Sequence, residues 1–158
     1  MNDFKQLSTA DLLKAHAGIM EELRTRNILR SANSPTGDLA EYLFCKAFGW
    51  DQASNSVKGL DAVDAAGVRY QIKGRRVLRR NPSRQLSAIR DLDGFDTLAI
   101  VLFDADYNII KAALIPAKEV KAGSTFVAHT NSHKFIARDS IWQSPAVLDV
   151  TDKLRAVA

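Results

Sequence analysis

The sequence predicts an α/β fold with a mixed central sheet flanked by helices. Apolar and polar residues alternate through the runs 60–64 and 68–73, which is typical of a half-buried β-hairpin. Two further strand-like runs follow at 97–103 and 108–115. Helical patterns come before the first of these runs and after the last. We therefore expect helices packed against a sheet of at least four strands.

Length and composition point to one globular domain. The chain has 158 residues, of which 46% are hydrophobic, enough for a sizeable core. We expect a single domain over 1–158, with an N-terminal helix (1–30), a core (36–115) and a C-terminal extension (116–158). The sequence has neither a long apolar span nor a signal segment, which predicts a soluble, cytoplasmic protein that does not bind a membrane. The single Cys45 excludes an intrachain disulfide and a cysteine-rich zinc site.

Two helices are expected in the first third of the chain. Ser8 is a candidate N-cap for a helix that continues to about Ile28 and carries one apolar stripe. Thr36 is a candidate N-cap for a second helix from Gly37 to Phe48. This second helix is apolar almost all round, which predicts that it is buried.

Glu41 is an exception on the second helix, because apolar residues surround it. A carboxylate in such surroundings needs an ion pair, a hydrogen bond or a bound cation. We expect Lys73 or a divalent metal to be that partner. Two interpretations without catalysis stay open for Glu41, namely a narrow exposed strip of the helix and a structural ion pair.

The hairpin over 60–73 places three polar residues on one face. Gly67 suits the left-handed last position of a three-residue hairpin loop, and this loop pairs Asp61 with Gln71. Because side chains alternate along a strand and paired residues share a face, Asp61, Gln71 and Lys73 then point the same way. Most of the apolar residues of both runs point the other way, so the polar set is a candidate reaction site.

Basic residues are concentrated directly after this hairpin, in a stretch without acidic residues. They are Lys73, Arg75, Arg76, Arg79, Arg80 and Arg84. Guanidinium groups suit bidentate contact with phosphates, so we expect these arginines to bind nucleic acid. The alternative is a solvated loop. The formal net charge of +4 adds only mild support for an anionic partner.

The rest of the chain is expected to complete the sheet. The runs 97–103 and 108–115 are joined by turn residues and predict a second hairpin. Pro116 is expected to start a short helix that ends near Gly123, followed by a short strand near 126–128 and a terminal helix after Asp149. The sequence of this extension does not indicate any chemistry.

With Glu41 on a helix, Asp61 on one strand and Gln71-Ile72-Lys73 on the next, the chain resembles the PD-(D/E)XK nuclease superfamily. Restriction endonucleases and Holliday junction resolvases belong to it. The resemblance covers about 37–115 and implies a restriction endonuclease-like core. It further implies that Asp61, Gln71 and Glu41 bind Mg²⁺ or Mn²⁺ and that Lys73 orients the attacking water. The segments 37–41 and 70–73 also look like those of bacterial proteins associated with this fold.

The chain departs from the family at two places. Gln71 stands where the family usually has an acid, and 56–59 contains no Pro-Asp dipeptide. A glutamine oxygen can still bind magnesium, but the site loses one negative charge. Glu41 restores that charge if it reaches the metal.

Three functions are compatible with these residues. The first is a magnesium-dependent nuclease that cleaves DNA, for which a homodimer with two sites would suit double-strand cleavage. The second is a catalytically inactive nuclease fold that binds DNA or a partner protein, as the neutral Gln71 suggests. The third is a structural or regulatory dimer whose basic loop is only solvated.

Overall fold

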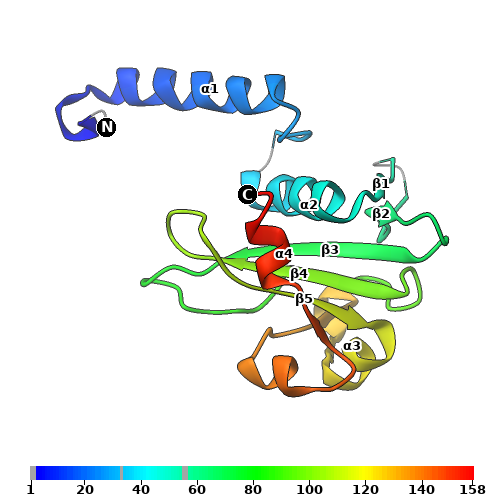
Figure 1. Cartoon of the computed structure of the whole chain (residues 1–158). Helices are drawn as coiled ribbons and strands as arrows, with labels where there is room; N and C mark the ends of the chain where they lie inside the picture. The colour runs from blue at the N-terminus through cyan, green and yellow to red at the C-terminus, as the bar shows by residue number, and fades with distance from the viewer. Residues whose placement is uncertain (1–2, 33, 55–56) are drawn as a thin grey trace.

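A six-stranded mixed sheet forms the centre of the molecule (Figure 1). The structure, a computed structural model, describes residues 3–32, 34–54 and 57–158. Across the sheet the order is β1 (Asp51–Gln52), β2 (Ala62–Val63), β3 (Arg69–Arg76), β4 (Thr97–Phe103), β5 (Ile109–Pro116) and β8 (Leu148–Asp149). The strands β3 and β4 are parallel, and the other neighbouring strands of this sheet are antiparallel. The α/β class with a mixed, helix-flanked sheet is therefore confirmed.

Helices cover both faces of the sheet (Figure 1). On one face, α2 (Pro35–Phe48) and α4 (Thr151–Arg155) pack in one hydrophobic cluster with apolar residues of β3, β4 and β5. On the other face, α3 (Ala117–Gly123) packs with the segment 77–96, which connects β3 to β4. A small hairpin of β6 (Thr125–Val127) and β7 (Ser132–Lys134) extends this second layer. Three 3₁₀ turns complete the fold: η1 (Phe4–Gln6), η2 (Ala128–Thr130) and η3 (Asp139–Gln143).

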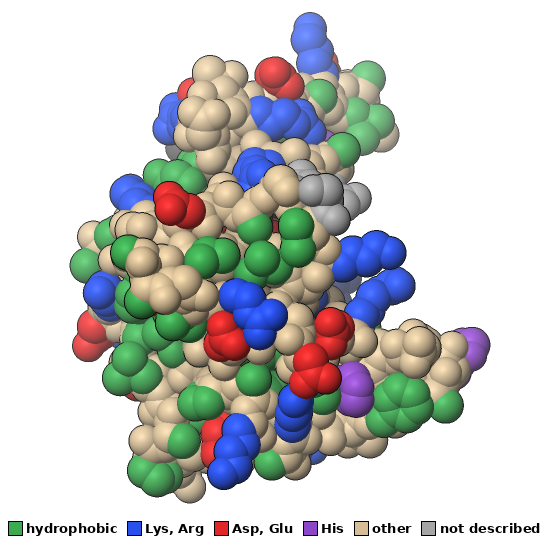
Figure 2. Space-filling model, turned by 90° about the vertical axis from the view of Figure 1, so that its right-hand side faces the viewer, with side chains coloured by type: hydrophobic (Ala, Val, Ile, Leu, Met, Phe, Trp, Pro, Cys, Tyr) green, Lys and Arg blue, Asp and Glu red, His purple; other side chains and the backbone are tan. Residues whose placement is uncertain are grey.

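The first helix, α1 (Thr9–Thr25), lies apart from the sheet layers (Figure 1). Ser8 is its N-cap as predicted, and the Ser8 hydroxyl accepts a hydrogen bond from the Asp11 N–H at 3.2 Å. The helix ends earlier than the predicted Ile28, because Asn27 turns into the left-handed conformation with a φ of 58°. None of its residues is buried, and hydrophobic side chains are exposed on the top part of the molecule in Figure 2.

The second helix begins two residues before the predicted Gly37. Pro35 occupies its first turn, where proline costs no hydrogen bond and its fixed φ suits the helix. The N-cap is therefore Ser34, and Thr36 lies inside the helix with its hydroxyl 3.3 Å from that of Tyr107. The predicted end at Phe48 is confirmed, with Gly49 in the left-handed conformation after it.

The hairpin of β2 and β3 has the predicted register. Ala62 pairs with Tyr70, and the Asp64 N–H donates to the Val68 carbonyl, which continues the same pairing into a three-residue loop. Gly67 has a φ of 82°, as this loop requires. Strand pairing in β2 covers only two residues, so within the described part of the chain no strand pairs with the β2 side of β3 beyond Tyr70.

The later elements lie close to their predicted places. The runs 97–103 and 108–115 form β4 and β5 as an antiparallel pair, and α3 follows Pro116 and ends at Gly123. The short strand β6 and the terminal helix α4 are also present. No helix within the described part of the chain is long and apolar enough to cross a membrane.

Candidate active site

The four predicted site residues line one pocket of about 750 Å³. It lies at the free edge of β3, and its walls come from three parts of the chain. The start of α2 forms one wall, 58–61 and β3 form the second, and 87–91 forms the third. The predicted residues in it are Glu41, Asp61, Gln71 and Lys73.

Asp61 is fixed at the edge of β3 by the main chain. Its Oδ2 atom accepts a hydrogen bond of 2.6 Å from the Ile72 N–H. The Asp61 N–H in turn donates to the Tyr70 carbonyl at 2.9 Å. Burial raises the pKa of Asp61, an effect that the Ile72 hydrogen bond and the charge of Lys73 oppose. The carboxylate is thus held rigidly in surroundings that favour a compensating cation.

Gln71 carries an unpaired polar atom in this site, as far as the described residues show. The residue is only 6% exposed. Its side-chain oxygen, Oε1, is buried and has no hydrogen-bond partner among the described residues. A buried carbonyl oxygen without a partner costs about 1–3 kcal/mol. A ligand that this oxygen could bind would remove that cost.

Lys73 follows Gln71 on the same side of β3. Its Nζ atom donates to the Ala88 carbonyl at 3.3 Å. Burial lowers the pKa of Lys73, while the charges of Asp61 and Glu41 raise it and that of Arg90 lowers it further. The amine therefore lies within electrostatic range of both carboxylates of the pocket.

Glu41 does not form an ion pair with Lys73, which was one of the two partners that we expected for it, beside a divalent metal. Its Oε2 atom accepts a hydrogen bond of 2.9 Å from Gln52 Nε2 and lies 3.8 Å from Arg30 Nη1. The reason is geometric, since Glu41 lies on the α2 side of the sheet edge and Lys73 projects towards segment 87–91. Burial and the nearby charge of Asp61 raise the pKa of Glu41.

The set of oxygen atoms in the pocket fits a hard divalent cation. Two carboxylates with raised pKa values and one unpaired amide oxygen offer the ligand type that Mg²⁺ and Mn²⁺ prefer. Within residues 3–32, 34–54 and 57–158, no group of three His, Cys, Asp or Glu side chains could hold a metal. Asp91 also lines the pocket but does not complete such a group, so the donor set that fits an ion is the two acids together with Gln71.

The five predicted nucleic-acid-binding arginines do not share one surface. Arg75 lines a second pocket beside the first. Arg76 points to the other face of β3, where it donates to the Ala105 carbonyl and stacks over Tyr107. Arg84 is paired with Asp139 at 2.7 Å. Arg79 and Arg80 are exposed on the turn that Leu78 and Asn81 close.

Sequence reasoning missed two basic residues of the first pocket. Arg90 and Lys58 both line it, and both are exposed. Neither makes an ion pair within the described chain. Arg90 stands among acidic residues in the sequence, which hides it from a search for basic clusters. Only the path of the segment 77–96 across the sheet brings Arg90 to the site.

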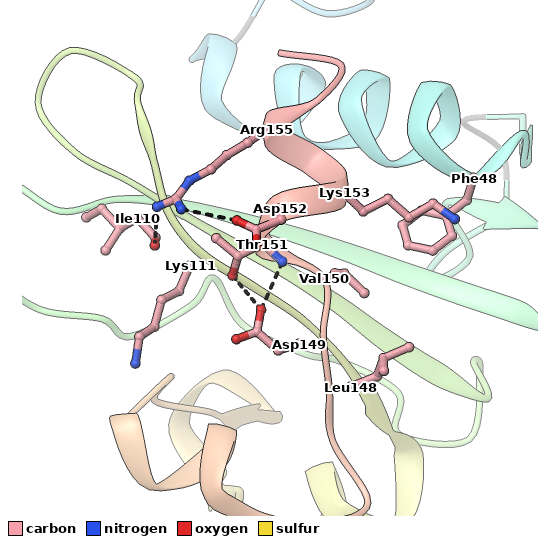
Figure 3. Close-up of a pocket in the computed structure, with 10 residues that line it drawn as sticks. All are labelled: Phe48, Ile110, Lys111, Leu148, Asp149, Val150, Thr151, Asp152, Lys153 and Arg155. Carbon is pink, nitrogen blue, oxygen red and sulfur yellow. Dashed lines mark hydrogen bonds and ion pairs between the residues drawn. The ribbon is translucent and has the colours of Figure 1, made fainter.

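Another pocket, of about 640 Å³, lies where α4 meets β5 (Figure 3). Its charged side chains already have partners inside the protein. Arg155 donates to the carbonyls of Ile109 and Ile110, and Asp149 accepts from the Thr151 N–H and hydroxyl. Lys153 lies over the Phe48 ring. Because these groups are satisfied, we place the candidate site in the pocket of Gln71 instead.

The comparisons with known proteins do not assign the chain to a family. No family model matches the chain, and no curated protein is significantly similar to it in sequence.

Proposed function

We propose that this protein is a divalent-metal-dependent nuclease that hydrolyses phosphodiester bonds in DNA. One observation carries the proposal. Gln71, whose buried Oε1 atom lacks a partner among the described residues, lines the same pocket as Asp61, Glu41 and Lys73. A magnesium or manganese ion is the ligand that these oxygen atoms and charges suit best.

The proposal includes a restriction endonuclease-like core. Support comes from the order of helix, hairpin and further strands, with Glu41 on α2, Asp61 before β2 and Gln71-Ile72-Lys73 on β3. This order resembles the PD-(D/E)XK superfamily. The parallel pairing of β3 with β4 and the position of α2 over one face are compatible with such a core.

The residues divide the chemical tasks between them. Asp61, Gln71 and Glu41 would hold the ion, which when bound supplies charge neutralisation and lowers the pKa of water. Lys73 is placed to donate a hydrogen bond to the attacking water from its Nζ atom and to stabilise negative charge on the phosphoryl oxygens. The Ile72 N–H holds the Asp61 carboxylate in place during these events.

A paired measurement tests this function. We would titrate the purified protein with MgCl₂ or MnCl₂ in a calorimeter and incubate the same samples with plasmid DNA. We expect the wild type to bind the ion and cleave, and Asp61→Asn and Lys73→Met to lose cleavage while staying folded. Asp61→Asn should also lose ion binding. Unchanged cleavage in both variants would refute the proposal.

A second candidate function is a catalytically inactive nuclease fold that binds DNA or a partner protein. The neutral Gln71 favours it, because the predicted set of metal ligands then has only two carboxylates, those of Glu41 and Asp61. In that case DNA binding would be salt-dependent and indifferent to magnesium and to Asp61. The same titration separates the two functions, since the inactive protein would neither bind the ion nor cleave.

A further inference from the structure

The candidate active site adjoins a second pocket. This second pocket, of about 410 Å³, shares Gly74, Ser87 and Ala88 with the first. The two pockets therefore adjoin along β3, and we call them together the β3 groove. A groove that continues past the reacting groups can bind the middle of a polymer chain, whereas a closed pocket can bind only the end of such a chain.

Three contacts define the direction of this groove. The segment after β3 comes back alongside it in the opposite direction, and three of its carbonyl groups accept hydrogen bonds from side chains on one face of β3. Arg75 donates to Ser83 at 3.0 Å, Lys73 to Ala88 at 3.3 Å and Arg69 to Asp93 at 3.3 Å. Arg90 lies between the last two contacts. Arg90 lines the first pocket and Arg75 lines the second, so the two arginines lie in different parts of the groove.

Arg75 and Arg90 are the arginines of the groove whose charges are not neutralised. Neither makes an ion pair among the described residues. The contact with Ser83 fixes the Arg75 guanidinium without removing its charge. Two residues along a strand span roughly 7 Å, so Arg75 and Lys73 are separated by about the distance between neighbouring phosphates of an extended strand.

We infer that a nucleic-acid strand lies along the β3 groove, with Arg75 and Arg90 binding phosphates on opposite sides of the site. The phosphodiester at Lys73 is then internal to the strand. This inference deepens the proposed function and rests on it for the cleavage step. It also assigns phosphate binding to Arg90, and it gives no role to Arg84, whose charge Asp139 already neutralises.

Binding measurements test the two arginines without requiring catalysis. We would measure the affinity of a fluorescein-labelled single-stranded oligonucleotide by anisotropy at several salt concentrations. Arg90→Ala and Arg75→Ala should each weaken binding about tenfold and lower the salt slope by about one. The control is Arg138→Ala, which removes the same charge from an exposed residue that lines neither pocket and should change affinity less than about twofold. Equal effects of Arg90→Ala and Arg138→Ala would overturn the inference.

Closed circular DNA tests the internal position of the cleaved bond. We would compare circular single-stranded DNA and closed plasmid with linear molecules of the same sequence. Cleavage of the circles supports the inference. Degradation of linear DNA alone would overturn it and leave the nuclease function standing. Absence of cleavage on every substrate, with binding still dependent on Arg90, would refute the nuclease function and the internal cut, and would leave the groove as a binding site.

Discussion

The Asp61 carboxylate accepts a hydrogen bond from the Ile72 main chain, with 2.6 Å between the Asp61 Oδ2 atom and the Ile72 nitrogen. A residue proposed to hold a metal therefore also satisfies a backbone N–H at the free edge of β3. Removing this side chain affects both the chemistry and the fold. An experiment on Asp61 must separate the two effects.

Replacing Asp61 with Asn keeps an oxygen that can accept the hydrogen bond from Ile72. We expect Asp61→Asn to fold and to lose magnesium binding and cleavage. Asp61→Ala leaves the Ile72 N–H without its partner, and should lower the free energy of unfolding by about 1–3 kcal/mol relative to Asp61→Asn. Urea unfolding of both variants measures this difference. Equal stabilities would show that the hydrogen bond has no net effect on the fold.

The ionised Asp61 should cost stability when no metal is present. Burial raises its pKa in the folded protein. Between the ordinary pKa and this raised value the folded state holds more protons, so the free energy of unfolding falls as pH rises. We expect wild type to become less stable than Asp61→Asn as pH rises from about 4 to 7, as measured by thermal melts without magnesium.

Asp139 is a control for that pH series, because its effect on the stability of the protein should change with pH in the opposite direction from that of Asp61. Hydrogen bonds from Arg84 and Lys111 lower the pKa of Asp139. Its contribution to stability is therefore present above the ordinary pKa and is lost on acidification. Asp139→Asn should destabilise the protein near pH 7 and have little effect near pH 3. Parallel melting curves for wild type and Asp61→Asn would contradict the raised pKa that burial gives Asp61.

Changing Gln71 to Glu should restore a third carboxylate. We expect Gln71→Glu to bind magnesium more tightly than wild type, because the ion then meets one more negative charge. Without magnesium the variant should melt at a lower temperature, since position 71 is only 6% exposed. Differential scanning fluorimetry with and without magnesium gives both results. Gln143→Glu, on an exposed turn, should show neither effect. An equal magnesium shift in all three proteins would contradict the role of position 71.

Gly74 holds α2 close to β3 next to the site. A β-carbon at residue 74 would be 2.8 Å from the Thr36 carbonyl oxygen and 2.9 Å from the Ala40 β-carbon. We expect Gly74→Ala to lower the free energy of unfolding by about 1–3 kcal/mol, because the helix must move away. Gly18 lies inside α1, and a β-carbon added there would have no neighbouring atom within 4 Å, so Gly18→Ala serves as the comparison. It should raise helix stability by roughly 0.5–1 kcal/mol. Chemical denaturation compares the two.

Local patterns in the sequence predicted most of the elements near the site. The alternation of residues and the left-handed Gly67 gave the hairpin register, because pairing and turn type are coupled over a few residues. The start of α2 was harder to predict, since Ser34 and Thr36 are both of a residue type that commonly forms an N-cap. Ser34 is the N-cap in the structure, because Pro35 occupies the first turn of the helix. The α1 stripe predicted a helix correctly, but it could not say whether that helix would be buried.

The sequence by itself determined that Asp61, Gln71 and Lys73 share a face, because side-chain alternation along paired strands is a local rule. The resemblance of these residues to a nuclease motif also comes from the sequence, and it stays a prediction. Only the tertiary structure decided that Glu41 pairs with Gln52 and Arg30, that Arg84 is neutralised by Asp139, and that Arg90 lines the pocket. These contacts join residues whose proximity depends on how a helix and a long connecting segment pack on opposite faces of the sheet. No pattern within either segment encodes that packing by itself.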